Sequence, residues 1–186
     1  MHKSGFVNII GNPNVGKSTL MNAFVGEKLS IITSKAQTTR HRILGIVNGD
    51  NFQIIFSDTP GIIKPAYKLQ ASMMESVNSA FEDADLLIYM VEIGEKELKD
   101  SQFFKKITDT KTPILLLLNK IDISNQNILE AQASLWKSKV PNAEFYPISA
   151  LTGFNVKNVF NRLVDLLPKS PPYFPKDQLT DKPERF

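Results

Sequence analysis

The most informative stretch of this sequence is Gly11-Asn12-Pro13-Asn14-Val15-Gly16-Lys17-Ser18. It fits the pattern G-x-x-x-x-G-K-[ST], in which a glycine-rich loop surrounds phosphate groups. Residues 6–10 before it form a short apolar run typical of a buried strand, and residues 18–25 after it carry apolar side chains at helical spacing. The flanks therefore predict the order of strand, loop and helix that places backbone N–H groups around an anion.

Each specified position of this pattern has a chemical reason. Gly11 and Gly16 permit backbone angles and close approaches that a side chain would prevent. Lys17 is expected to reach the outer phosphates as a point charge, and the Ser18 hydroxyl is a suitable magnesium ligand. The alternative is a glycine turn that precedes a lysine by chance, but the predicted strand and helix favour a phosphate-binding loop, called the P-loop below.

Composition sets the broad class. The chain has 186 residues, of which 42% are hydrophobic and 22% charged, as expected for one globular domain with an appendage. The absence of cysteine excludes disulfides and thiolate metal sites and fits a reducing compartment, so we expect a cytoplasmic protein. A net charge of +3 is compatible with a nucleic-acid partner but does not by itself indicate one.

Apolar runs and helical patterns alternate along the chain. Strands are predicted over residues 6–10, 43–47, 52–56, 85–91, 113–118 and 144–148, and helices over 18–25, 71–81, 101–107, 128–139 and 156–167. Asn48-Gly49-Asp50-Asn51 predicts a hairpin between the second and third strands. The sequence therefore predicts an α/β fold: a mostly parallel six-stranded sheet with one antiparallel hairpin strand and helices on both faces.

Polar motifs follow three of the later strands. Asp58-Thr59-Pro60-Gly61 comes after the third, Asn119-Lys120-Ile121-Asp122 after the fifth and Ser149-Ala150-Leu151 after the last. Strand ends of such a sheet share one edge, so we expect these motifs to meet the P-loop there. Asp58 could hold magnesium opposite Ser18, usually through a water, although Pro60-Gly61 is also a turn signal. Gly61 lets a backbone N–H approach the terminal phosphate.

The motif after the fifth strand, residues 119–122, indicates which base the site would bind. The Asp122 carboxylate can accept the N1–H and the exocyclic amino group of guanine, a pair of donors that adenine lacks. Asn119 can bond guanine N7 and brace neighbouring loops, the Lys120 stem can lie across the base, and the Ser149-Ala150-Leu151 backbone can donate to guanine O6. A polar loop that caps a strand is the alternative for this triplet alone.

The ordered set GNPNVGKS, DTPG, NKID and SAL resembles the translation-factor-like GTPases of the Ras-like superfamily of P-loop NTPases. Asn12-Pro13-Asn14 resembles the group that contains Era, Der and the tRNA-modifying GTPases. Residues 35–42 (KAQTTRHR) resemble the switch I of the Era family, and residues 174–186 resemble the segment that leads into its KH RNA-binding domain. We therefore expect a GTPase domain over residues 1–168 and a proline-rich linker over 169–186, toward a KH domain absent from this sequence.

The resemblance implies roles for individual residues. Lys17, Thr39 and Gly61 would be catalytic, and Ser18, Thr39 and Asp58 would hold Mg²⁺. Thr38 also fits the switch I ligand, and Thr39 is favoured because it directly precedes Arg40. Asn14 resembles an asparagine that some relatives use to hold K⁺ beside the phosphates. The residues expected to contact GTP or GDP are Gly11, Asn12, Pro13, Asn14, Val15, Gly16, Lys17, Ser18, Thr19, Asp58, Thr59, Pro60, Gly61, Ile62, Asn119, Lys120, Asp122, Ser149, Ala150 and Leu151.

Ile62 departs from the Ras-like pattern. Ras-like enzymes place there the glutamine that orients the attacking water, and isoleucine cannot hydrogen-bond water. The Era family shares this feature. We therefore expect slow hydrolysis that depends on Mg²⁺, Lys17, backbone donors and a monovalent cation.

The expected function is that of an Era-type GTPase switch in small ribosomal subunit assembly, with 16S rRNA bound mainly through the absent KH domain. The alternatives are a GTPase of the Der or tRNA-modification class, or a GTP-dependent binding module with negligible hydrolysis.

The resemblance also implies peripheral membrane association of the full-length protein, and we favour a monomer. The charged residues Glu92, Glu95, Lys96, Glu97, Lys99 and Asp100 are expected to form a solvated loop and helix start.

Overall fold

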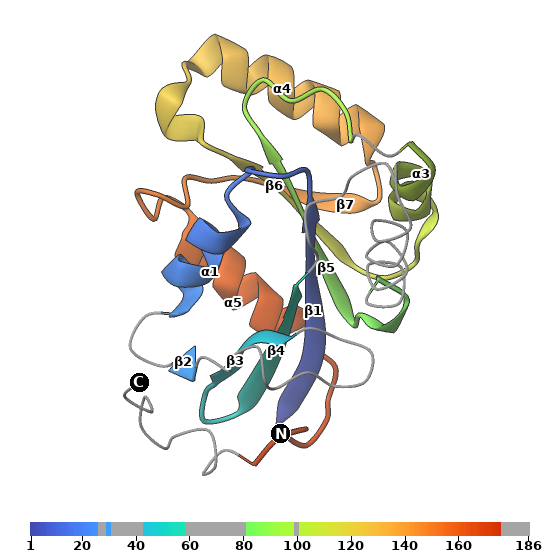
Figure 1. Ribbon diagram of the computed structural model, residues 1–186, viewed down its shortest axis with the longest axis vertical. Helices are drawn as coiled ribbons and strands as arrows, with labels where there is room; N and C mark the ends of the chain where they lie inside the picture. The colour runs from blue at the N-terminus through green and yellow to red at the C-terminus, as the bar shows by residue number, and fades with distance from the viewer. Residues whose placement is uncertain (26–28, 31–42, 59–80, 99–100, 176–186) are drawn as a thin grey trace.

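The structure is a computed structural model that describes residues 1–25, 29–30, 43–58, 81–98 and 101–175. Across these ranges a single sheet has the strand order β2-β3-β4-β1-β5-β6-β7 (Figure 1). The six predicted strands are confirmed, and a two-residue strand, β2, joins the edge of the sheet. The strands are β1 Lys3–Gly11, β2 Leu29–Ser30, β3 Ile43–Asn48, β4 Phe52–Asp58, β5 Leu86–Glu92, β6 Ile114–Asn119 and β7 Ala143–Pro147.

Five of these strands, from β4 through β1, β5 and β6 to β7, pair in parallel, whereas β2–β3 and β3–β4 pair antiparallel. The predicted hairpin is therefore the β3–β4 pair. Pairing places Asp58 opposite Ile9 and Asn119 opposite Glu92, so the carboxyl ends of β4, β1, β5 and β6 lie at one edge of the sheet. This edge is where an open α/β sheet binds its ligand.

Helices cover both faces of the sheet, as predicted (Figure 1). Helix α1 (Lys17–Val25) and helix α5 (Val156–Leu166) pack on one face, and α3 (Ser101–Asp109) and α4 (Gln126–Lys139) on the other. A 3₁₀ turn, η2 (Ile121–Ile123), precedes α4. Helix α4 begins two residues earlier than predicted because the Asn125 side chain caps it by accepting from Ile128 N at 3.0 Å. Of the helix predicted over 71–81, only residue 81 is described, and residues 81–83 are helical.

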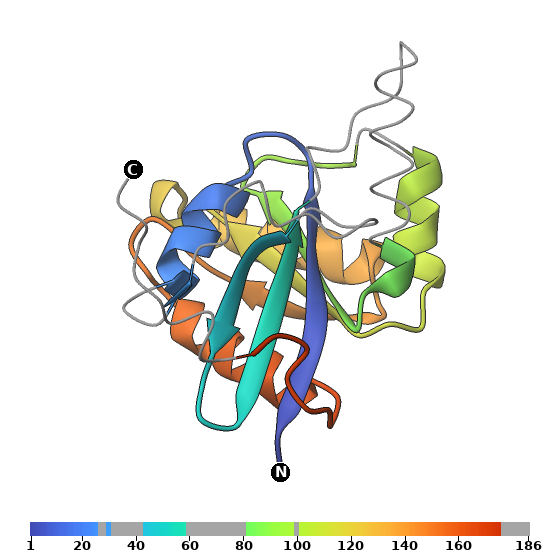
Figure 2. The ribbon, with the colours of Figure 1, turned by 60° about the horizontal axis from the view of Figure 1, so that its bottom comes forward.

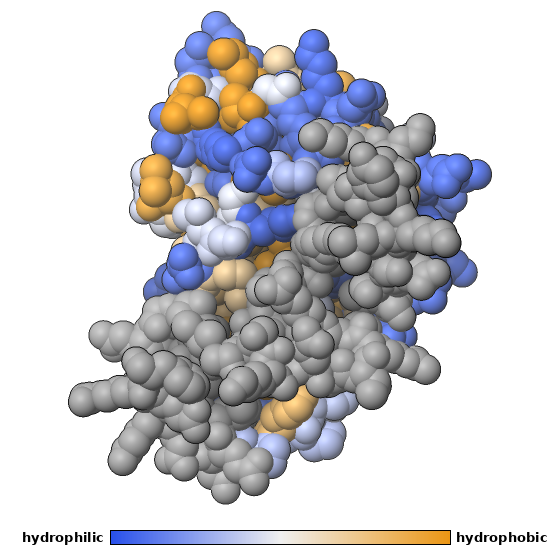
Figure 3. Space-filling model, viewed as in Figure 1, coloured by the Kyte–Doolittle hydropathy of each residue, from blue (hydrophilic) through white to orange (hydrophobic). Residues whose placement is uncertain are grey.

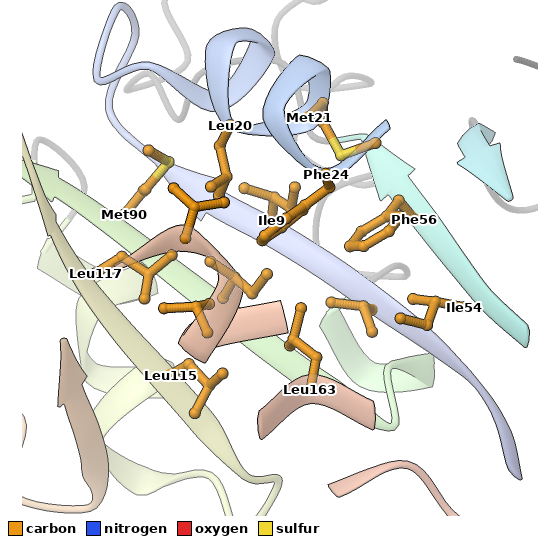
Figure 4. Close-up of a cluster of buried hydrophobic side chains, with 14 of the residues drawn as sticks. Ile9, Leu20, Met21, Phe24, Ile54, Phe56, Met90, Leu115, Leu117 and Leu163 are labelled. Carbon is orange, nitrogen blue, oxygen red and sulfur yellow. The ribbon is translucent and has the colours of Figure 1, made fainter. Parts of the chain in front are cut away.

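The core forms on both faces because side chains alternate along each strand. On β5, for example, Ile88 and Met90 face α1 and α5, whereas Leu87 and Tyr89 face α3 and α4. Figure 4 shows the first of these clusters, where Leu20, Met21 and Phe24 of α1 lie over strand residues such as Ile9 and Phe56. All six residues of β6 are buried, which explains why it reads as a continuous apolar run.

A different segment covers the outer face of β3, β4 and β1. Residues 169–174, predicted to belong to an extended linker, lie across these strands (Figure 2). Gln53 of β4 is fully buried there, and its Oε1 accepts from the backbone N–H groups of Tyr173 and Phe174 at 2.9 and 3.1 Å. Gln53 Nε2 donates to Phe174 O at 2.9 Å, and the rings of Phe6 and Tyr173 are 5.1 Å apart. The first part of this segment is thus packed against the domain.

In the part of the chain that the structure describes, no helix is both long enough and apolar enough to span a membrane.

Candidate nucleotide-binding site

The P-loop connects the end of β1 to the first turn of α1. Lys17 is the first residue of α1, and its Nζ donates back to Gly11 O at 3.1 Å, so the ammonium group lies over the loop. Gly16 has a φ of +106°, and a Cβ placed there would lie 2.3 Å from Asn119 Nδ2. The glycine is therefore required both by the backbone angle and by the close approach of Asn119.

Asn119, the last residue of β6, joins the P-loop to the loop after β7. Its Nδ2 donates to Val15 O at 2.8 Å, and its Oδ1 accepts from Ala150 N at 2.9 Å. The side chain is in the core of the site, with the residue 3% exposed. These contacts use one of the two Nδ2 hydrogens, and the other is a donor of the kind that guanine N7 accepts.

Asp122 lies in η2, at the mouth of the same site. Its Oδ1 accepts from Ser149 Oγ at 2.8 Å, and Ser149 Oγ in turn accepts from Thr152 N at 3.2 Å. The buried Ser149 thereby fixes the orientation of an exposed carboxylate. A carboxylate held in one orientation can accept two parallel N–H donors with little loss of side-chain entropy.

Lys120 spans the site from the β6 end to the P-loop. Its backbone adopts the left-handed conformation, with a φ of 67°. Its Nζ donates to Asn14 O at 2.9 Å and forms an ion pair with Glu92, at the end of β5. The ammonium group is thus held by Asn14 O and by the Glu92 carboxylate, and the aliphatic stem of Lys120 lines the pocket.

A pocket of about 230 Å³ opens between the P-loop and the β6 and β7 ends. Two exposed apolar side chains stand at its rim, Ile123 at 72% and Leu151 at 78% exposure. Apolar residues are visible on this part of the surface (Figure 3). A planar base has both apolar faces and polar edges, which matches this mixed lining. The lining residues are Gly16, Thr19, Asn119, Lys120, Asp122, Ile123 and Leu151.

Two of the three residues expected to hold Mg²⁺, Ser18 and Asp58, are among the described residues. Ser18 is exposed in the first turn of α1, and Asp58 is the last residue of β4, where it is paired with Ile9 of β1. A hydroxyl and a carboxylate are the hard donors that Mg²⁺ prefers. The residues present therefore fit the ion.

The structure brings together the described part of the predicted site, namely the P-loop with Thr19 and the motifs after β6 and β7. The remaining predicted residues, Thr38, Thr39, Thr59, Pro60, Gly61 and Ile62, lie outside the described residues.

Two glutamates of the site were not expected to belong to it. Glu92 and Glu95 were interpreted as part of a solvated loop, but Glu92 pairs with Lys120, and Glu95 accepts a hydrogen bond from Asn12 of the P-loop. Burial and the nearby Glu95 charge also hold the pKa of Tyr89 above its usual range. No sequence pattern links residues this far apart, so a charge cluster next to a strand end was the only available signal.

Comparisons with known proteins agree with this geometry. The sequence profile of the family described as 50S ribosome-binding GTPase matches residues 6–120. The chain is 44% identical to a GTPase Era of Alkaliphilus metalliredigens over 186 residues, which is 100% of this chain and 63% of that protein. It therefore spans just under two thirds of the length of this relative.

Solved structures are similar as well. An Era variant of Aquifex aeolicus bound to GDP and AlF4⁻ has a TM-score of 0.78 at 40% identity, covering 97% of this chain and 62% of that one. Era in complex with MgGDPNP and nucleotides 1506–1542 of 16S ribosomal RNA has a TM-score of 0.79 at 40% identity, covering 98% of this chain and 63% of that one.

The fold and the site together define a P-loop GTPase domain. More narrowly, the chain belongs to the 50S ribosome-binding GTPase family. The resemblance to Era seen in the sequence is confirmed by these relatives.

Proposed function

We propose that this chain is the GTP-binding and GTP-hydrolysing domain of an Era-type switch that acts in small ribosomal subunit assembly. The observation that carries the proposal is the direct link, through Asn119, between the P-loop and the Asp122–Ser149 pair. This link would join a phosphate site to a base site, and the similarity to an Era structure bound to MgGDPNP and a 16S rRNA fragment supports the assignment.

Base recognition follows from the donors and acceptors of the site. Asp122 would accept guanine N1–H and the 2-amino group, and Asn119 would donate to N7. The Lys120 stem and Leu151 would cover the faces of the base. Adenine would leave the Asp122 charge without donors, so the site should reject ATP by a factor of about 10⁴ or more.

Hydrolysis would be served by groups around the terminal phosphate. Lys17 would neutralise the β- and γ-phosphates, and the switch residues Thr39 and Gly61 would supply a hydroxyl and a backbone N–H there. When bound to Ser18, Asp58 and Thr39, Mg²⁺ supplies charge that offsets the developing negative charge. With Ile62 in place of glutamine, no side chain at that position orients water, so hydrolysis would be slow.

We also propose that K⁺ assists at Asn14. This side chain is exposed on the P-loop, and its backbone has a φ of 66°. Replacing Asn14 with glycine removes the carboxamide and still permits this angle. Single-turnover GTP hydrolysis should be faster in potassium than in sodium for the wild type, and equal in the two salts for Asn14→Gly. A wild-type rate that ignores the cation would contradict the role of K⁺.

The proposal that Ile62 has no catalytic role can be tested separately. Ile62→Ala should hydrolyse GTP in potassium at nearly the wild-type rate, because the residue offers no hydrogen bond to lose. A large fall in rate would show that Ile62 takes part in catalysis. Absence of any GTP turnover in the wild type would favour a binding module with negligible hydrolysis.

Residues 1–168 would form the GTPase domain, and 169–186 the segment that leads to a KH domain in the whole protein. RNA contacts would reside mainly in that domain, so residues 1–186 alone should bind a 16S rRNA 3′-end fragment weakly. Tight, specific binding would contradict this division.

A cytoplasmic monomer with peripheral membrane association in the full-length protein completes the proposal. A preference for a tRNA or large-subunit RNA by the whole protein would instead favour the tRNA-modification or Der class.

A further inference from the structure

The loop after β5 is tied to the P-loop through the side chain of Asn12. Asn12 Nδ2 donates to Glu95 Oε1, and the same nitrogen donates to the backbone oxygen of Glu97 at 3.0 Å. The other carboxylate oxygen of Glu95 accepts from Glu92 N at 2.9 Å. Glu95 therefore connects Asn12 to the end of β5, across a sequence separation of 83 residues.

Asn12 is well placed to transmit this link to the phosphate site. It directly follows Gly11, and it is 7% exposed, so its side chain points into the protein and not toward a ligand in solvent. Its amide Nδ2 is anchored at two acceptors, which restricts the backbone torsions of the loop's first turn. Lys120 anchors Asn14 in a similar way by donating to its backbone oxygen at 2.9 Å.

The charge of Glu95 is unfavourable for the ligand that the loop binds. A carboxylate near an anion site repels phosphate, with an energy that grows as the local dielectric constant falls. A carboxylate at this position is explained if the order it gives to the loop outweighs that repulsion, because a preorganised site loses less entropy on binding.

We propose that Glu95 is a positioning residue for nucleotide binding, which holds the P-loop in its phosphate-binding shape through Asn12. The inference rests on the proposed function, since it requires that phosphates bind at this loop. On this proposal Glu95 raises the affinity for nucleotide by ordering the P-loop, although its negative charge alone would lower that affinity.

Two alanine variants of the same loop separate geometry from charge. Glu95→Ala removes the acceptor of Asn12 and one negative charge. Glu97→Ala removes the same charge but leaves the backbone oxygen that Asn12 uses. The dissociation constant of a fluorescent GDP analogue is measured for the full 186-residue chain in Mg²⁺ buffer. We expect a roughly tenfold weaker affinity for Glu95→Ala, about 1.4 kcal/mol, and no weakening for Glu97→Ala.

Two further variants test the route through Asn12. Glu95→Gln keeps one oxygen that can accept from Asn12 but loses the acceptor of Glu92 N, so it should bind GDP more tightly than Glu95→Ala does, although the charge is gone in both. Asn12→Ala should weaken binding about as much as Glu95→Ala, and the double variant should lose no more than either single one. At saturating GTP the Glu97→Ala control should hydrolyse at the wild-type rate, and the loss for Glu95→Ala should appear in KM more than in kcat.

Three outcomes would overturn the inference: Glu95→Ala binding GDP as tightly as the wild type or tighter, additive losses in the double variant, or Glu95→Gln as weak as Glu95→Ala. Thermal unfolding without nucleotide identifies a variant that fails to fold, and Glu95→Gln then carries the test. A wild-type chain that binds no GDP would instead refute the proposed function itself.

Discussion

Gly16 is the residue at which the two halves of the site come closest. We predict that Gly16→Ala destabilises the chain and weakens GDP binding at least about tenfold, because the new Cβ would meet Asn119 Nδ2 and displace its bond to Val15. Gly153→Ala is the matched control, since Gly153 also has a positive φ, +82°, but a Cβ there meets nothing within 4 Å. Urea unfolding should show about 1 kcal/mol lost in the control and clearly more in Gly16→Ala. Equal losses would show that contact with Asn119 is unimportant.

At this scale the sequence was informative where chemistry restricts the residue type. Asn119 and Asp122 could be singled out because few side chains can present the acceptors and donors that guanine requires. Glu95 could not, because its role depends on meeting Asn12 in space, and a glutamate next to other charges is usually solvated. Ile123, which lines the pocket proposed to hold the base, was also missed, because an apolar residue beside a motif has no distinctive pattern.

Among the elements, the segment that follows α5 is held in part by one buried side chain, Gln53. We predict that Gln53→Ala speeds hydrogen exchange at the Tyr173 and Phe174 amides and lowers the free energy of unfolding by about 1–3 kcal/mol, because both N–H groups lose their acceptor. Truncation after Pro168 provides the control. In the truncated chain the same substitution should have a much smaller effect on unfolding. Unchanged exchange at the two amides would contradict the contact.

Strand β7 and helix α5 are joined at the surface by Glu144 and Arg162, whose Nε and Nη2 donate to the two carboxylate oxygens at 2.9 and 2.6 Å. These hydrogen bonds from Arg162 hold the pKa of Glu144 below its ordinary value of 4.5. Because the folded pKa is lowered, the pair stabilises the fold above pH 4.5, and this contribution is lost as pH falls through the lowered value.

The corresponding prediction concerns the Tm of Arg162→Ala. It should be slightly below that of the wild type at pH 7, since the pair is exposed to solvent. The difference should shrink as pH falls below the ordinary pKa of glutamate. A difference that grows in acid would contradict the assigned direction of the shift.

Strands and helices followed from periodicity because burial imposes it: β5 and β6 are covered on both faces and read as continuous apolar runs. The packing of residues 169–174 did not follow. That segment is proline-rich and has no period, and the side chain that holds it, Gln53, appears in the sequence only as one polar residue within an apolar strand.

For the whole molecule, the sheet edge is what unites distant parts of the sequence. The P-loop after β1, Asp58 of β4, Glu92 of β5 and Asn119 of β6 lie along it because parallel strands present their carboxyl ends together. For the P-loop, Asp58 and Asn119 this convergence was predicted from the alternation of strands and helices, whereas the place of Glu92 was not. The links within it, from Asn119 to Val15 and from Ser149 to Asp122, required the structure.

The central claim is that this edge reads guanine through Asp122, and exchanging the base tests it most directly. Xanthine carries an acceptor where guanine carries its 2-amino donor, so an amide at position 122 should suit xanthine better than a carboxylate does. GDP and XDP dissociation constants are measured for the wild type and Asp122→Asn in the same buffer. We predict that the wild type prefers GDP by orders of magnitude and that Asp122→Asn prefers XDP. A variant that keeps its preference for GDP would contradict the account.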